Sequence, residues 1–403
     1  MKRNRKNVDK NPLVEAIESR ITDAILKYGE LEFHDVEIEA EELEIVLQPM
    51  MHRVVVPVIE KKVKELIKVS FKEPKIEMPG KIVEVKIGAT KSEGGTRDRV
   101  LIIGGETLPP YYYILGKEVM PHPPIIGADV FDMKIPLPRV VRQHFEDVLD
   151  DPIAWAKRWV DKYGAELINI HLVSTDPSIK DTPPSESAKL IEDLLQEVKV
   201  PITVGGSGNP EKDVKVFKKI ADIAEGERIV LNSLNLDMKL EEIGEHIRNK
   251  DCIVIDFSPM DLDKAREINR KLYDYLPKER IIDDLNIAGI GYGLEYGFTV
   301  IERARLSALK GDEELQHPLV AAASNAWAAR EAWLKMDPYW GPKEIRGPAW
   351  EIITGLVALL AGADYLMVVH PLSLKVLKDV IDFLLKGEGP RIDDIYDWVS
   401  AKF

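Results

Sequence analysis

The strongest constraint on the fold is a regular alternation of short apolar runs and longer amphipathic runs through the last two thirds of the chain. Apolar runs such as IVLN and LMVV are typical of parallel strands that are buried on both faces. About eight strand–helix units in ~270 residues match a (β/α)8 barrel of ordinary size. We expect strands at 124–131, 166–172, 201–205, 228–233, 252–258, 280–285, 319–324 and 364–369.

Residues at the expected helix ends support this interpretation. Ser185 and Asn209 are suitable N-cap residues, and Pro210 falls at a first helical position. Gly164 and Gly362 stand where a left-handed C-cap is expected before the next strand. The main alternative, a doubly wound open sheet, would want a Gly-rich dinucleotide-binding turn after the first strand, and GADVFDM is not one. The sequence therefore favours an α/β fold of the TIM-barrel class.

The barrel is expected to span 121–390, with a C-terminal tail over 391–403. The first 120 residues differ, because helical patterns there flank an acidic stretch, HDVEIEAEELEIVLQP. We interpret 1–78 as a helical extension. The runs KIVEVKIGA and RVLIIGGE alternate apolar and polar residues around a turn with Gly94 and Gly95, which predicts a β-hairpin ribbon over 79–120, laid against the barrel.

Composition excludes several classes of function. The one cysteine, Cys252, permits no intrachain disulfide and no self-contained iron–sulfur cluster, which needs about four thiolates. It heads an apolar run and is most simply a buried small side chain. The net charge of -14 argues against nucleic acid as a partner. No apolar stretch reaches the ~18 residues that span a bilayer, and the basic start lacks a signal core. We expect a cytoplasmic protein without membrane contact.

In a (β/α)8 barrel the active face is formed by residues just after each strand. No strand end carries a lysine, so Schiff-base chemistry is poorly supported. No HExxH motif, close cysteine–histidine pair or nucleophile elbow is present, so we expect no protein-ligated metal. The candidates are mostly amides, hydroxyls, small residues and scattered carboxylates, namely Asp129, Asp132, Asn169, His171, Gly205, Gly206, Ser207, Asn232, Ser233, Asp256, Ser258, Asp283, Asn286, Ser324, Asn325 and His370.

Each candidate also has an interpretation without function. Asn169 and Asn232 would serve equally well by satisfying backbone groups at the strand ends. For Asp256 we favour a functional role, because a buried carboxylate is costly unless it is paired. His171 and His370 are more often packing histidines than acid–base groups.

Two loops stand out. In GGSGNPEKD, Gly206 and Ser207 lie beside a helix N-terminus, where backbone amides bind anions, although a tight turn explains the sequence equally well. After the seventh strand, aromatic residues crowd a long segment that suits a flat cofactor or a partner surface, unless its tryptophans pack inward. These aromatic residues are Trp327, Trp333, Tyr339 and Trp340, and Tyr111, Tyr112 and Tyr113 form a second cluster of the same kind.

Several stretches carry a family resemblance over about 80–370. They are LIIGGETLP, IGADVFDM, INIHLVSTDPSIKDTPPSE, ITVGGSGNPEKD, NSLNLD and the NAW…YWGP…RGPAWE segment. With them the chain resembles the small (delta) subunit of the corrinoid iron–sulfur protein in archaeal acetyl-CoA decarbonylase/synthase complexes. STDPSIKDTP and GGSGNPEKD are the most specific phrases.

The resemblance implies a barrel related to pterin-binding methyltransferases. It implies a heterodimer with a larger (gamma) subunit that carries the iron–sulfur cluster and a corrinoid, within a wider carbon monoxide dehydrogenase/acetyl-CoA synthase complex. The cobamide would lie between that subunit and this barrel's mouth, and this chain would hold no cluster. It places Asn169, Asn232 and Asp256 at plausible equivalents of the residues that hold the pterin ring in related methyltransferases. Together with the other strand-end and loop candidates, the residues that we expect to bind a cofactor are Asn169, His171, Gly206, Ser207, Asn232, Asp256, Asn325, Trp340 and His370.

Three functions remain open. In the first, a non-catalytic partner subunit caps the corrinoid and supports methyl transfer between a tetrahydropterin, such as tetrahydromethanopterin or tetrahydrosarcinapterin, and the acetyl-CoA-forming centre. In the second, the chain alone is a tetrahydropterin:corrinoid methyltransferase that uses Asn169, Asn232 and Asp256. The third is an unrelated lyase that binds a phosphorylated substrate through the GGSGNP turn.

Overall fold

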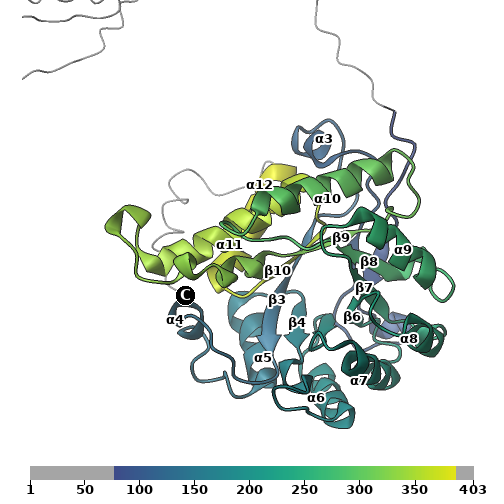
Figure 1. Ribbon diagram of the computed structural model, residues 1–403, viewed down its shortest axis with the longest axis horizontal. Coiled ribbons are helices and arrows are strands. Elements are labelled where there is room, and N and C mark those ends of the chain that lie inside the picture. Colours follow the sequence, from purple (N-terminus) through teal and green to yellow (C-terminus); the bar gives the residue numbers. More distant parts are fainter. Residues whose placement is uncertain (1–76, 387–403) are drawn as a thin grey trace, which may run out of the picture. The chain divides into compact units, whose positions relative to one another are not determined.

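The computed structural model describes residues 77–386. Its core is a closed barrel of eight parallel strands, in which sequence neighbours pair and β10 pairs with β3 to complete the ring (Figure 1). This confirms the predicted TIM barrel and each of its expected strands. The strands are β3 (Ile125–Phe131), β4 (Ile168–His171), β5 (Ile202–Gly205), β6 (Val230–Leu234), β7 (Ile253–Phe257), β8 (Ile281–Asp284), β9 (Leu319–Ala322) and β10 (Tyr365–Val368).

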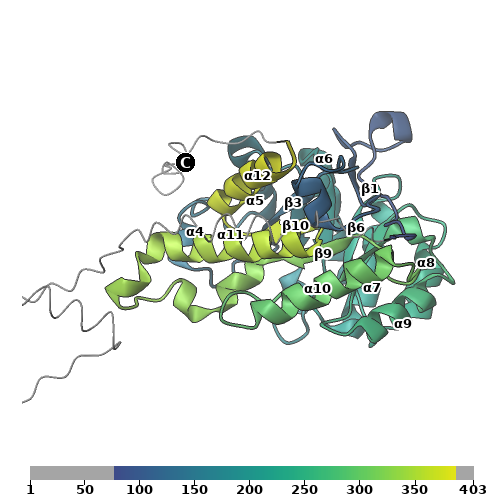
Figure 2. The same cartoon turned by 90° about the horizontal axis from the view of Figure 1, so that it is seen from above.

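Helices cover the outside of the barrel (Figure 1). The loop before α11 protrudes beyond the strands of the barrel (Figures 1 and 2). Apart from residues 77 and 78, the expected helical extension lies outside the described residues, as does the expected tail over 391–403. The helices are α3 (Pro110–Ile114), α4 (Arg139–Arg142), α5 (Pro152–Tyr163), α6 (Pro184–Glu197), α7 (Pro210–Ile223), α8 (Leu240–Ile247), α9 (Leu262–Leu272), α10 (Leu294–Leu309), α11 (Lys343–Ala361) and α12 (Pro371–Lys386).

The helix-end predictions are correct except for one. The Asn209 side chain accepts a hydrogen bond from the amide of Lys212, and Pro210 is the first residue of α7. Gly164 ends α5 with a φ of 69°, and Gly362 ends α11 with a φ of 120°. Ser185 is not an N-cap, because α6 already begins at Pro184, whose ring favours the first helical position.

The predicted hairpin is present and closes the N-terminal end of the barrel. β1 (Val85–Ile87) and β2 (Leu101–Ile103) pair antiparallel, joined through the short helix η1 (Lys91–Glu93). The hairpin's buried Val85, Ile87 and Ile103 pack on lumen-facing residues of the barrel strands. Gly88 also donates to the Arg228 carbonyl at 3.0 Å, just before β6.

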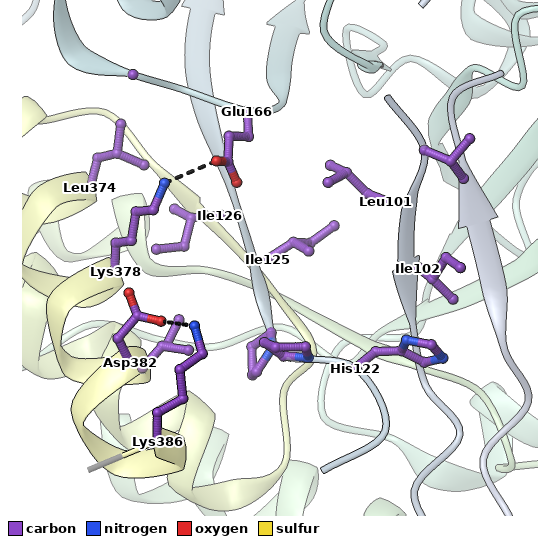
Figure 3. Close-up of a pocket in the computed structure, with 15 residues that line it drawn as sticks. Leu101, Ile102, His122, Ile125, Ile126, Glu166, Leu374, Lys378, Asp382 and Lys386 are labelled. Atoms are coloured by element: carbon purple, nitrogen blue, oxygen red, sulfur yellow. Dashed lines mark hydrogen bonds and ion pairs between the residues drawn. The ribbon is translucent and has the colours of Figure 1, made fainter. Parts of the chain in front are cut away.

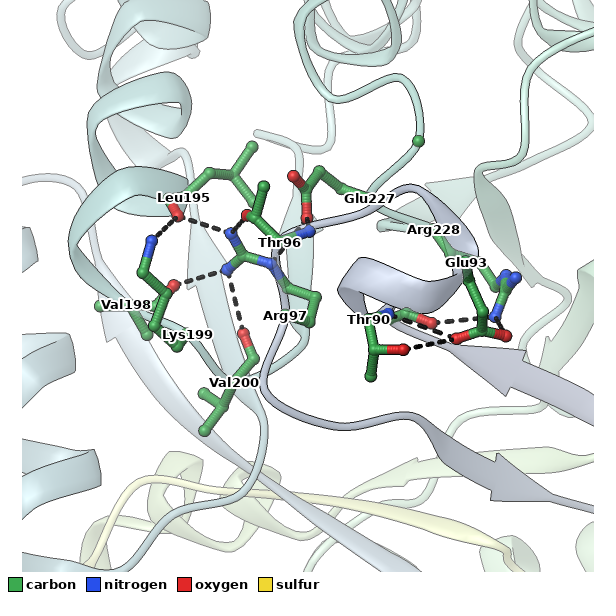
Figure 4. A network of polar contacts seen from close by, with 12 residues as sticks. Thr90, Glu93, Thr96, Arg97, Leu195, Val198, Lys199, Val200, Glu227 and Arg228 are labelled. Atoms are coloured by element: carbon green, nitrogen blue, oxygen red, sulfur yellow. Dashed lines mark hydrogen bonds and ion pairs between the residues drawn. The ribbon is translucent and has the colours of Figure 1, made fainter.

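A buried arginine fastens the hairpin turn to the barrel. The guanidinium of Arg97 is 2.7 Å from a Glu227 carboxylate oxygen and donates to the carbonyls of Leu195 and Val198, each at 2.5 Å (Figure 4). Arg97 is only 3% exposed. A charge buried so deeply is stable only when its donors are satisfied, and here the end of α6 and the turn before β6 supply the acceptors.

A second buried polar cluster includes Glu106 of the motif GGETLP. Glu106 follows the hairpin and lies 3.4 Å from Arg305 of α10, which also pairs with Asp364 just before β10. Asp364 in turn accepts from the Leu319 amide at 2.7 Å. Burial raises the pKa of Glu106 to about 8. The cluster therefore joins the hairpin to the start of the last two strands.

No helix among residues 77–386 is long and apolar enough to cross a membrane.

Candidate binding site at the barrel mouth

Strand alternation decides which strand-end residues face the lumen. On β7, Ile253 and Ile255 belong to the inner cluster that meets the hairpin, whereas Val254 belongs to the outer cluster under the helices. The same parity along the paired strands assigns Asp129, Asn169, His171, Thr203, Asn232, Asp284 and Tyr365 to the lumen.

A buried polar network occupies the lumen on the side of β3, β4, β5 and β10. The side-chain Nδ2 of Asn169 donates to Asp129 Oδ1 at 2.9 Å, and its Oδ1 accepts a hydrogen bond from the Tyr365 hydroxyl. The Tyr365 hydroxyl also lies 2.9 Å from Thr203 Oγ1. Gly127 makes room for this arrangement, since a Cβ there would lie 2.3 Å from Asn169 Oδ1. Side chains, rather than backbone groups, therefore satisfy Asn169.

His171 lies at the end of β4, next to this network. Its Nε2 is 3.2 Å from Asp129 Oδ1, and its ring stacks on Phe131 with centroids 5.2 Å apart. The His171 side chain is 23% exposed, so the ring remains partly accessible at the mouth. A Cβ at Gly205 would lie 2.8 Å from His171 Nδ1, so the glycine at the end of β5 gives the ring its space.

Asn232 differs from Asn169 in its hydrogen bonding. Its backbone carbonyl accepts from the Gly206 amide at 2.7 Å. Within residues 77–386, no hydrogen bond is made by its side-chain amide, which is partly exposed and on the lumen side of β6. Asn232 is therefore a mouth residue with donor and acceptor capacity left for a ligand.

The GGSG turn is filled by a carboxylate of the protein itself. Asp213, in the first turn of α7, accepts from the amide and hydroxyl of Ser207 at 2.9 and 2.8 Å, and from the Gly208 amide at 2.8 Å. A Cβ at Gly206 would lie 2.5 Å from this carboxylate. The amides of Ser207 and Gly208 already have an anionic acceptor, so the phosphate-binding interpretation of the turn loses its basis.

Asp256 lies outside the lumen. It shares the outer side of β7 with Val254 and is fully buried beside Asp283, its neighbour on β8. Asp283 accepts from Asn269 of α9 at 3.1 Å. Burial and the Asp283 carboxylate raise the pKa of Asp256 well above its ordinary value, which favours a neutral carboxyl group between sheet and helix. The prediction that grouped Asp256 with the mouth residues placed it on the wrong side of the strand.

On β8 the carboxylate that faces the lumen is Asp284, which was not among the residues predicted from the sequence. It shares the inner side of β8 with Ile282 and accepts from the Asn286 amide at 2.8 Å. Burial raises its pKa to about 7. Asn325 lies close by, because its amide donates to the Ile287 carbonyl at 2.8 Å. The run IIDD carries no signal that separates Asp283 from Asp284, because both follow apolar residues; the pairing of β8 with β7 places Asp284 on the inner side.

His370 is a packing histidine. It is 3% exposed, stacks on Trp327 with centroids 5.9 Å apart, and accepts from the Leu372 amide through Nδ1 at 3.1 Å. Burial lowers its pKa to about 3, which keeps the ring neutral. Glu351 of α11 lies nearby and accepts from the Val369 amide at 2.7 Å, and burial raises its pKa to about 7. His370 therefore supports Trp327 of the loop after β9, and Glu351 holds the end of β10.

The aromatic residues after β9 divide into two groups. Trp327 packs inward, where Gly347 of α11 lets the helix approach its ring, and Trp333 donates to the Trp327 carbonyl at 3.2 Å. Tyr339 and Trp340 are 94% and 45% exposed.

Two further aromatic residues are exposed at the same end of the barrel. Tyr292 and Tyr296, after β8, are 59% and 66% exposed. We call Tyr292, Tyr296, Tyr339 and Trp340 the rim aromatics. Tyr111–Tyr113 are on α3, behind the hairpin and away from the mouth.

Among residues 77–386, no group of three or more His, Cys, Asp or Glu side chains has the geometry of a metal site. The mouth offers amides, the carboxyl group of Asp284 with its pKa raised to about 7, a partly exposed histidine and exposed aromatic side chains. Such groups bind and orient a polar ring system or its amide substituents.

Residues 84–369 match the model of the family described as CO dehydrogenase/acetyl-CoA synthase delta subunit. The acetyl-CoA decarbonylase/synthase complex subunit delta of Archaeoglobus fulgidus is 46% identical over 83% of this chain and 75% of that protein. The subunit delta of Methanocaldococcus jannaschii is 40% identical over 98% and 97%. Among solved structures, a dihydropteroate synthase from Coxiella burnetii in complex with pteroic acid is 11% identical, covers 75% of this chain and 99% of its own, and has a TM-score of 0.47. The chain belongs to the delta-subunit family of the acetyl-CoA decarbonylase/synthase complex.

Proposed function

We propose that this subunit supports methyl transfer between a tetrahydropterin and the acetyl-CoA-forming centre by capping a cobamide carried by a larger (gamma) subunit, in the cytoplasm. The observation that carries the proposal is the exposure of the four rim aromatics, which follow the C-terminal ends of β8 and β9. Large exposed aromatic side chains are typical of partner surfaces.

The residues at the mouth fit a corrinoid. A corrinoid is a flat ring with amide side chains at its edge, so it needs apolar faces and amide partners. The rim aromatics offer the faces, and Asn232 offers an amide with unused hydrogen-bonding capacity. When bound, the corrinoid would supply the cobalt that accepts and releases the methyl group. The residues of this chain would orient the ring edge and exclude water from its face.

Trp340→Ala tests the proposal in the complex of the full chain with the larger subunit. We expect partner affinity to fall about ten-fold, because exposed aromatic anchors contribute most to interfaces. Phe383→Ala is the matched control, since Phe383 is 56% exposed on α12, away from the mouth, and we expect its affinity to stay within about two-fold. A Trp340→Ala variant that keeps its affinity but melts at a lower temperature would identify Trp340 as a packing residue instead.

A second candidate, an autonomous tetrahydropterin:corrinoid methyltransferase, is favoured by Asn232 and Asp284. The amide of Asn232 is available, and a carboxyl group with a pKa of about 7 can either donate or accept at neutral pH. Methyl transfer from a methylated pterin to free cobamide, measured with this chain alone, distinguishes the two functions. Turnover that is lost in Asn232→Ala and Asp284→Ala but kept in Asp256→Asn would favour the enzyme, and absence of turnover would exclude it.

A further inference from the structure

A groove of about 520 Å³ lies at the N-terminal end of the barrel, remote from the mouth. β2 forms one wall, the segment that leads into β3 forms the floor, and α12 forms the other wall (Figure 3). The residues that matter here are Val100, Leu101, His122, Ile125, Lys378 and Lys386.

The groove offers apolar surface rather than unpaired charge. Val100, Leu101 and Ile125 are partly exposed in it. The lysines at its edge are already paired, because Lys378 is 3.0 Å from Glu166 and Lys386 is 2.6 Å from Asp382 (Figure 3). A small charged ligand would have to break these pairs. An apolar segment with a few polar groups would leave them intact.

We propose that the groove is the docking site of the chain's own C-terminal segment, residues 387–403. This segment follows directly on Lys386, which itself lines the groove. Its first residues, GEGP, are a turn sequence that allows the chain to reverse after α12. The groove is lined on α12 from Leu374 to Lys386, about 18 Å of helix. Seventeen residues at ~3.3 Å each can span about 56 Å, so the segment is long enough to return along it.

The composition of the segment matches the groove. In RIDDIYDWVSAKF, Ile392, Ile395 and Val399 recur at intervals of three and four residues, with Trp398 beside them and Phe403 at the end. A peptide of this kind has an apolar face to bury and acidic residues that stay in water.

Disulfide trapping in the full chain tests the proposal. One variant carries Val100→Cys and Val399→Cys, and a second carries His122→Cys and Ile395→Cys. The native Cys252 is buried and does not compete. The control pairs Val399→Cys with Met260→Cys, since Met260 is 39% exposed on the loop between β7 and α9, at the mouth end.

We expect at least one groove pair to form an intramolecular disulfide about ten-fold faster than the control, because docking raises the local concentration of the two thiols. Adding Trp398→Asp to that variant should return the rate to the control value. Groove pairs that both react at the control rate would overturn the proposal. So would a product of twice the chain mass, which would show that a second copy occupies the groove.

Discussion

Replacing Arg97 with methionine tests the idea that the hairpin is an integral part of the barrel. Methionine keeps much of the apolar stem but removes every donor. The Leu195 and Val198 carbonyls then lose a charged donor, and Glu227 loses an ion-pair partner 2.7 Å away. Breaking a buried ion pair by removing one partner costs about 3–5 kcal/mol. We expect a loss of this size in the free energy of unfolding, measured by urea denaturation.

Arg99→Met is the matched control. Arg99 is two residues further along the same turn and pairs with Asp98, but its side chain is 40% exposed. Exposed pairs contribute about 0–1 kcal/mol, so this variant should unfold close to the wild type. Hydrogen exchange should also show faster opening of β1 and β2 in Arg97→Met alone. If the two variants lost equal stability, or Arg97→Met lost less than about 1 kcal/mol, the anchoring argument would be refuted.

Three further changes address the lumen and the loop above it. Tyr365→Phe removes the hydroxyl between Asn169 and Thr203 and should lower the free energy of unfolding in urea by about 1–3 kcal/mol. The double variant Tyr365→Phe/Thr203→Val should lose less stability than the sum of the two single variants, because the two hydroxyls share one hydrogen bond. Gly127→Ala forces a Cβ to within 2.3 Å of Asn169 Oδ1 and should cost about 1–3 kcal/mol, so an unchanged midpoint would show that the amide can move away. Burial raises the pKa of Glu351 from 4.5 to about 7 in the folded state, so between these pH values the folded state binds more protons than the unfolded state. The free energy of unfolding should therefore fall by up to about 3 kcal/mol as the pH rises from 4.5 through 7. Glu351→Gln should remove this decline, and an identical slope in both proteins would assign the pH dependence to other groups.

Much of the barrel was predictable because its signals are local. Each strand is a short apolar run, each helix has its own amphipathic pattern, and caps such as Asn209 and Gly164 act within a few residues. These features depend on backbone geometry and the hydrophobic effect, which operate wherever the segment finally lies. The hairpin was predictable for the same reason, as was the concentration of amides and hydroxyls at the strand ends.

The composition of the mouth was less predictable, because it depends on which side of a strand faces the lumen. Strands buried on both faces are apolar on both faces, so the pattern does not separate inner from outer positions. Asp256 and Asp284 therefore looked alike in the sequence, although one lies under α9 and the other at the mouth. The register of eight strands around a closed ring makes that choice.

The alternation of strand and helix patterns by itself determined the barrel, its order of strands and the loops that form its mouth, since these follow from local burial and chain direction. Tertiary structure decided the rest. Asp213 fills the turn in which Gly206 and Ser207 were candidate anion ligands. His370 and Trp327 stack although 43 residues separate them. Contacts between distant segments leave no periodic signal in the chain, because each depends on where the folded barrel brings its loops together.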